Sequence, residues 1–134
     1  MPGQGAGAER TLLRMSDTQE QTTEIRVIHE GERAWADLVD PPGTLGTGGA
    51  ETETFTSRDG AFQTGFWRRE PDTWSFERLY DEVALIVAGE ADIETNGQVF
   101  TVRAGDLLVT PKGSTGTWRI KETIVKFFVI YDRG

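Results

Sequence analysis

The chain has 134 residues, a net charge of -8 at pH 7 and no cysteine. Its length fits one domain, and a hydrophobic fraction of 37% is enough for one core. The acidic charge disfavours nucleic acid as a partner. The lack of cysteine excludes disulfides, thiolate metal sites and a cysteine nucleophile. Because no apolar run reaches the length of a membrane span, we expect a cytoplasmic protein with no membrane partner.

The N-terminal part of the sequence divides into a tail and an arm. Residues 1–22 are small and polar, which is typical of a flexible tail, and we place the folded domain at 23–134. Residues 24–28 alternate between polar and apolar side chains and predict a first strand. Residues 30–39, which carry Trp35, can form either a short helix or an extended arm, and the prolines that follow end any helix.

From residue 50 onward the pattern is one short strand after another. Turn residues separate these stretches, and Asn96-Gly97 is the strongest hairpin signal. No long amphipathic helix interrupts them, so the sequence predicts an all-β barrel or sandwich. The expected strands cover residues 52–56, 62–68, 74–79, 82–87, 91–94, 98–102, 107–110, 118–120 and 123–131.

Two motifs in this region resemble the signature motifs of the cupin superfamily. Glu82 to Gly89 matches E-x6-G, and Gly105 to Gly113 matches G-D-x4-P-x-G. The resemblance implies a single-domain antiparallel jelly-roll barrel. Metal-binding cupins place three histidines around the glutamate, at positions that hold Ser75, Glu77 and Gly116 in this chain.

The missing histidines determine what we expect of metals and cofactors. The only histidine, His29, lies far upstream of both motifs, so we expect no imidazole-held transition metal and no cofactor. An alternative is a hard cation such as Mg²⁺ or Mn²⁺ held by oxygen atoms of Glu77, Glu82 and Ser75.

Within the superfamily, residues 64–130 are similar to the small cupins of the ethanolamine-utilisation protein Q type. The matching pieces include Gly65-x-Trp67, Tyr80-Asp81-Glu82-Val83, Gly116-x-Trp118 and Lys126. They cover about half of the chain. The family name also implies acetate-kinase-like or microcompartment-associated activity, but the sequence carries no phosphate loop that supports it.

Two glutamates are the candidate catalytic residues. The resemblance implies that Ser75 and Glu77 face the barrel interior, where Glu77 would meet Glu82. Two carboxylates in a desolvated cavity cannot both ionise cheaply, which suits general acid-base catalysis. Two alternatives stay open. Glu82 can form a structural ion pair with Arg68, Arg78 or Lys126. A shift of one residue in register would turn Glu77 toward solvent.

Five further residues are candidates for substrate binding. Trp67 and Trp118 can wall an apolar cavity or simply pack in the core. Lys126 lies on a strand that is apolar on both faces, so its ammonium group must reach solvent or pair with a carboxylate. Tyr80 can place a hydroxyl at the cavity mouth or serve as a turn aromatic. Ser75, on the predicted inner face, completes the set.

These observations favour a metal-independent enzyme that performs isomerisation, cyclisation or dehydration on a small organic molecule inside the barrel. The alternative is a small-molecule-binding or accessory protein that uses the same cavity without catalysis. We also expect a homodimer, because an arm over residues 24–39 could add a strand to the exposed sheet edge of a neighbouring copy.

Overall fold

A computed structural model describes residues 23–29, 33–38 and 49–133. This part of the chain contains strands and turns but no helix, and its strands join in one sheet. The all-β prediction is therefore confirmed. The strands are β1 (Ala50–Thr56), β2 (Phe62–Arg69), β3 (Thr73–Glu77), β4 (Asp81–Thr95), β5 (Gln98–Arg103), β6 (Leu107–Thr110) and β7 (Thr115–Tyr131).

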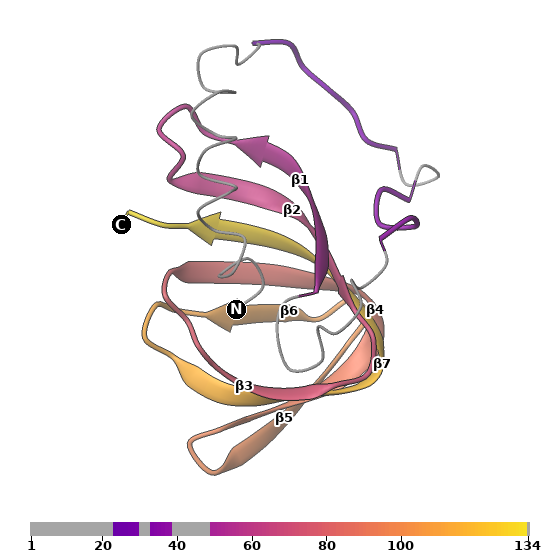
Figure 1. Ribbon diagram of the computed structural model, residues 1–134, viewed down its shortest axis with the longest axis vertical. Helices are drawn as coiled ribbons and strands as arrows, with labels where there is room; N and C mark the ends of the chain where they lie inside the picture. The colour runs from indigo at the N-terminus through magenta and orange to yellow at the C-terminus, as the bar shows by residue number, and fades with distance from the viewer. Residues whose placement is uncertain (1–22, 30–32, 39–48, 134) are drawn as a thin grey trace.

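The sheet is antiparallel and runs in the order β1-β2-β7-β4-β5, while β3 pairs with β7 and β6 pairs with β4. Figure 1 shows β4 and β7 curving through the molecule, with β1 and β2 toward one end and β3 and β5 toward the other. The sheet bends around a core and forms the expected cupin-like jelly roll. β4 is continuous over 15 residues and β7 over 17 residues. The sequence pattern predicted two shorter strands in place of each.

Glycine allows β4 to stay continuous through a sharp irregularity. Gly89 has φ 92°, and a Cβ atom there would lie 2.1 Å from the carbonyl oxygen of Thr123 on β7. The β4–β7 register shifts at this point. A turn in which Asn96 and Gly97 both have positive φ then joins β4 to β5, as the sequence predicted.

The core lies on the inner face of the bent sheet and is rich in tryptophan. The ring planes of Trp74 and Trp118 are stacked within 6° at a centroid distance of 5.9 Å, and Trp67 tilts against both. Trp74 and Trp118 are also partners in the β3–β7 register. Phe76, Ile86, Ala91, Ile93, Val102, Ile120, Ile124, Phe128 and Ile130 complete the core.

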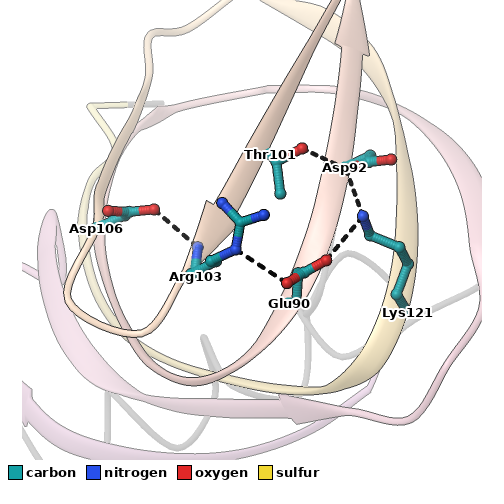
Figure 2. Close-up of polar contacts among 6 residues, drawn as sticks. All are labelled: Glu90, Asp92, Thr101, Arg103, Asp106 and Lys121. Carbon is teal, nitrogen blue, oxygen red and sulfur yellow. Dashed lines mark hydrogen bonds and ion pairs between the residues drawn. The ribbon is translucent and has the colours of Figure 1, made fainter.

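The outer face near the β4–β5 hairpin carries a network of charged side chains. Glu90 on β4 pairs with Arg103 on β5 and with Lys121 on β7, and Lys121 also reaches Asp92. The hydrogen bond from Lys121 lowers the pKa of Glu90. These ion pairs link β4, β5 and β7 at the surface, where their side chains remain partly exposed to solvent. Figure 2 shows Glu90, Asp92, Thr101, Arg103, Asp106 and Lys121.

The N-terminal arm differs from its prediction. Residues 24–28 form no strand, and Arg26 instead donates a hydrogen bond to the carbonyl oxygen of Thr54 on β1. Residues 34–37 form a turn, in which the indole of Trp35 lies 5.0 Å from the ring of Phe66 on β2. The described part of the arm thus contacts its own barrel.

The predicted tail at 1–22 lies outside the described residues. In the part of the chain that is described, no helix has the length and apolar character needed to cross a membrane.

Candidate functional site

A buried ion pair lies at the centre of the candidate site. Lys126 on β7 sits between Trp67 on β2 and Ile86 on β4 in the sheet register. Its Nζ lies 2.6 Å from Oε2 of Glu82, and both side chains are only 1% exposed. Inward-facing positions on adjoining strands bring the two groups together. A lysine buried this deeply requires such a partner, because an isolated ammonium group in an apolar core is very costly.

Arg78, which directly follows β3, adds a second cation to the same carboxylate. Its NH1 atom lies 3.6 Å from Oε1 of Glu82. Its Nε donates a 3.1 Å hydrogen bond to Oγ1 of Thr110 on β6, the residue opposite Glu82 in the register. The guanidinium also lies 4.8 Å from the ring centroid of Phe76. Two buried cations therefore share one buried carboxylate.

This environment changes the proton affinity of Lys126. Burial lowers its pKa from 10.5 to about 8, the charge of Glu82 opposes that shift, and the charge of Arg78 adds to it. With a pKa of about 8, roughly a tenth of the lysine is neutral at pH 7. An ordinary lysine is almost wholly protonated at that pH. Lys126 can therefore exchange a proton near neutral pH.

Aromatic rings enclose the ammonium group. Nζ of Lys126 lies 4.7 Å from the ring centroid of Trp67 and 5.5 Å from that of Trp118, within the range of cation–π attraction. Among the described residues, neither the indole N–H of Trp67 nor Oε1 of Glu82 has a hydrogen-bond partner. Gly49 packs against that indole N–H, where an added Cβ would lie 2.4 Å from Nε1, and Oε1 of Glu82 faces NH1 of Arg78 at 3.6 Å.

The structure brings together four of the residues singled out in the sequence: Glu82, Lys126, Trp67 and Trp118. Of the two interpretations of Glu82, the ion pair is present, and it involves both Lys126 and Arg78. Tyr80 is partly buried and packs against the core cluster.

The expected placement of Ser75 and Glu77 is wrong. Both side chains are exposed, and the hydroxyl of Ser75 lies 3.1 Å from that of Thr117 on the neighbouring strand. The inward positions belong instead to Phe76 and Arg78. The metal-binding cupin motif has four residues between its second histidine and the glutamate, which corresponds to Glu77 and Glu82, whereas three residues separate the inward-facing Arg78 from Glu82. One residue of difference reverses the face of every side chain on the strand.

Sequence reasoning missed Thr110 as a member of the site and named Arg78 only as one of three possible ion-pair partners of Glu82. The alternation of Trp74, Phe76 and Arg78 was the available signal, because large side chains at every second position mark the buried face of a strand. Thr110 is identified only by the β4–β6 register, which the sequence does not give.

The residues around Glu82 do not fit a metal ion. The inward positions near it hold an aromatic ring and a guanidinium, from Phe76 and Arg78, and Lys126 lies against its carboxylate. Gly116, at the third histidine position, faces Phe76, and a Cβ on Gly116 would lie 3.1 Å from that ring. Across the described residues no three histidine, aspartate or glutamate side chains gather into a ligand set. The oxygen-ligand alternative needed Glu77 and Ser75 beside Glu82, and neither lies there.

Comparisons with known proteins agree with the cupin-like fold. The family model described as the EutQ-like cupin domain matches residues 56–128. The acetate kinase EutQ of Escherichia coli K12 is 32% identical over 65 residues, which are 48% of this chain and 28% of that protein. The protein of the same name from Salmonella typhimurium is 29% identical over 65 residues, again 28% of its length. The chain thus spans well under half of the curated relatives that it matches.

Solved structures share the fold at low sequence identity. The ethanolamine utilization protein Q of Salmonella typhimurium aligns with a TM-score of 0.65 and 21% identity, covering 82% of this chain and 88% of that one. A protein of unknown function from Rhizobium leguminosarum aligns with a TM-score of 0.63 and 20% identity, covering 83% of this chain and 100% of that one. Because the family model spans more than half of the sequence and the fold agrees with it, this chain belongs to the EutQ-like cupin domain family.

Proposed function

We propose that the barrel interior is a metal-independent site for proton transfer on a small organic molecule, with Lys126 and Glu82 as the acid-base pair. The observation that carries the proposal is the 2.6 Å contact between these two buried groups. Glu77 has no part in it, because it lies on the exposed face.

The chemistry follows from the two protonation states of Lys126. Its pKa of about 8 gives it a usable neutral fraction near pH 7, so the amine can accept a proton and the ammonium can return one. Isomerisation, cyclisation and dehydration of small carbonyl compounds all need such a transfer. The carboxylate of Glu82, 2.6 Å away, is the partner group of the pair, and the charge of Arg78 lowers the proton affinity of the amine. The indoles of Trp67 and Trp118 exclude water from it.

A second candidate is ligand binding without catalysis, as in an accessory protein. The enclosure of Lys126 favours this alternative, because its side chain is only 1% exposed and the indoles of Trp67 and Trp118 lie against its ammonium group, so entry of a ligand requires the surrounding side chains to move. A binding protein tolerates such slow entry better than an enzyme does. The acetate kinase activity in the names of the two curated relatives is not proposed here, since the matched 65 residues are only 28% of those proteins.

The test is proton exchange in heavy water. Small 2-oxo acids and hydroxy ketones are incubated with the protein after dialysis against a chelator, and loss of the carbon-bound proton beside the carbonyl is followed by proton NMR. We expect catalysed exchange with one class of compound. Lys126→Met should lower the rate by about a hundredfold or more, since it removes the general base.

Glu77→Gln is the matched control, because it changes a carboxylate on the exposed face of β3. It should exchange protons at the wild-type rate. Tryptophan fluorescence reports binding independently, because three indoles line the site. Saturable quenching by a compound that shows no exchange would support the binding protein and reject the enzyme.

A further inference from the structure

The lysines of the chain lie at positions 112, 121 and 126, and Lys126 differs from the other two in both exposure and surroundings. Lys112 is exposed on the turn after β6. Lys121 is 45% exposed on β7, where it pairs with Glu90 and Asp92. Lys126 lies in the core and is only 1% exposed, with its Nζ against two indole rings. The fold therefore separates one amine of the chain from water.

The surroundings of Lys126 match those that make a lysine amine nucleophilic. An amine is activated when it lies in an apolar pocket or beside a second cation, because each condition favours its neutral form. The indoles of Trp67 and Trp118 supply the apolar walls, and Arg78 supplies the second cation. Burial lowers the pKa of Lys126 to about 8, the charge of Glu82 opposes that change, and the charge of Arg78 adds to it.

This activation is large compared with the obstacle that burial presents. At pH 7 a pKa of about 8 leaves roughly a tenth of Lys126 neutral, whereas an ordinary lysine is neutral in about three molecules out of ten thousand. Hydrogen bonds to Glu90 and Asp92 raise the pKa of Lys121, which reduces its neutral fraction further. Lys126 thus gains roughly three-hundredfold in neutral amine. That gain exceeds the penalty of entry if the surrounding side chains admit a small molecule for more than about one part in three hundred of the time.

From this setting we propose that Lys126 is also a nucleophile, which forms an imine with a small aldehyde or ketone inside the barrel. This chemistry rests on the proposed function in one respect, the entry of a carbonyl compound into the interior. An uncharged carbonyl compound suits the indole walls better than an ion does, because it loses less hydration on entry. The protonated imine withdraws electrons from the adjacent carbon, so the proton on that carbon is easier to remove.

The atoms and charges of imine formation balance with the groups already present. The lone pair of the neutral amine forms a bond from Nζ to the carbonyl carbon. The carboxylate of Glu82, 2.6 Å from Nζ, moves one proton from the nitrogen to the oxygen and gives a carbinolamine. It then moves the remaining proton of the nitrogen to the hydroxyl group, the C–O bond breaks and water leaves. The electron pair freed on nitrogen closes the C=N bond, and no oxidant or reductant is consumed.

Reductive trapping tests the imine directly. The protein is incubated at pH 7 with propanal or hydroxyacetone and with cyanoborohydride, which delivers hydride to the imine carbon and fixes the adduct as a secondary amine. Cleavage after Glu122 places Lys126 in a peptide that begins at Thr123, apart from Lys112 and Lys121. Mass spectrometry then compares the rates at the three lysines. We expect Lys126 to be alkylated at least tenfold faster than either of the others, although it is the least exposed of the three.

Arg78→Met and Arg119→Met form a matched pair of variants. Arg78→Met removes the second cation and leaves Glu82 and Lys126 as an ion pair, so the protein should fold while the pKa of Lys126 rises. Trapping at Lys126 should then slow severalfold. Arg119→Met removes a cation that pairs with Glu94 at the surface, and it should trap at the wild-type rate. Should Arg78→Met fail to fold, the wild-type pH profile replaces it, and trapping at Lys126 should stop rising above about pH 8.

Absence of an adduct at Lys126 overturns the proposal, and so does an adduct that forms there no faster than at Lys112 and Lys121. Equal trapping by the wild type and a folded Arg78→Met protein also contradicts it. The exchange experiment in heavy water separates this inference from the proposed function. Trapping at Lys126 without proton exchange supports the imine and rejects the proton-transfer enzyme, whereas exchange without trapping does the reverse.

Discussion

Nζ of Lys126 approaches Oε2 of Glu82 to 2.6 Å at a place where both side chains are almost wholly removed from solvent. Arg78 stands on the other side of the same carboxylate at 3.6 Å. Burying each of these ions costs hydration free energy, and only the attraction to its charged partners offsets that cost. The three groups are therefore stable in the interior only together. Substituting one member of the cluster should therefore affect stability differently from substituting two.

Glu82→Gln should be the most destabilising change in the cluster. It leaves the cations of Lys126 and Arg78 buried without a carboxylate between them. Removing one member of a buried ion pair typically costs about 3–5 kcal/mol of unfolding free energy. Urea unfolding measures the loss, and Glu77→Gln, on the exposed face, should unfold like the wild type.

Adding Lys126→Met to Glu82→Gln should recover part of that loss, because the double variant no longer buries an ammonium group beside an amide. A double variant that is less stable than Glu82→Gln alone would contradict this account of the cluster. So would a Glu82→Gln protein with wild-type stability.

Stability should depend on pH through Lys126. Folding lowers its pKa from 10.5 to about 8, so between these pH values the unfolded chain binds more protons than the native one. The free energy of unfolding contributed by this group therefore rises as pH increases from 8 to 10.5. The shift corresponds to about 3 kcal/mol in total. Lys126→Met should lack this rise. The measurement is the difference in the free energy of unfolding between wild type and variant, compared at pH 8 and at pH 10.5.

Alanine substitutions at Gly89 and Gly105 distinguish the cost of backbone strain from the cost of a steric clash. Gly89 and Gly105 have nearly the same φ, 92° and 94°. A Cβ on Gly89 would lie 2.1 Å from the carbonyl oxygen of Thr123, whereas one on Gly105 would meet nothing within 4 Å. Gly105→Ala should cost only the strain of a left-handed residue, about 1–2 kcal/mol. Gly89→Ala should cost clearly more in urea unfolding, and equal losses would show that β4 can shift to relieve the clash.

Thr110→Val tests the hydrogen bond that positions Arg78. The change keeps the side-chain shape but removes the oxygen that accepts from Nε of Arg78 at 3.1 Å. A buried donor left without its acceptor costs about 1–3 kcal/mol. Thr101→Val, which removes an exposed hydrogen bond to Asp92, should change stability little. If the two variants unfold alike, water has replaced the lost acceptor of Arg78.

The sequence predicts the fold well because its strongest signals are local. The hairpin at Asn96-Gly97 needs two residues with positive φ, and the strands around it are rich in β-branched residues. Predictions for the N-terminal arm and the long strands were weaker. The alternation at 24–28 is correct for a strand, but a strand also needs a neighbour to pair with, and a single segment does not reveal one. Conversely, the sequence predicted separate strands at 82–87 and 91–94, while the structure continues β4 through Gly89 between them.

The sequence predicts those parts of the candidate site in which the chemistry of one residue requires a particular neighbour. Lys126 on an all-apolar strand needed a carboxylate, and Glu82 supplies it. Glu77 could not be placed in the same way, because its face depends on how many residues connect β3 to Glu82. An error of one residue in that count placed Glu77 in the interior, whereas it lies in solvent and Arg78 holds the inward position.

The long pairing of β4 with β7 bears on the order in which the chain assembles. At one end of this ladder Glu94 pairs with Thr117, and the chain between them contains only the β4–β5 turn, β5 and β6. At the other end Asp81 pairs with Tyr131, so the chain between those two residues is much longer. Closing the shorter loop costs less entropy, so we expect the ladder to zip from Glu94 toward Asp81. Glu82 and Lys126 lie toward the end that closes last. Their substitution should therefore accelerate unfolding and leave the refolding rate nearly unchanged.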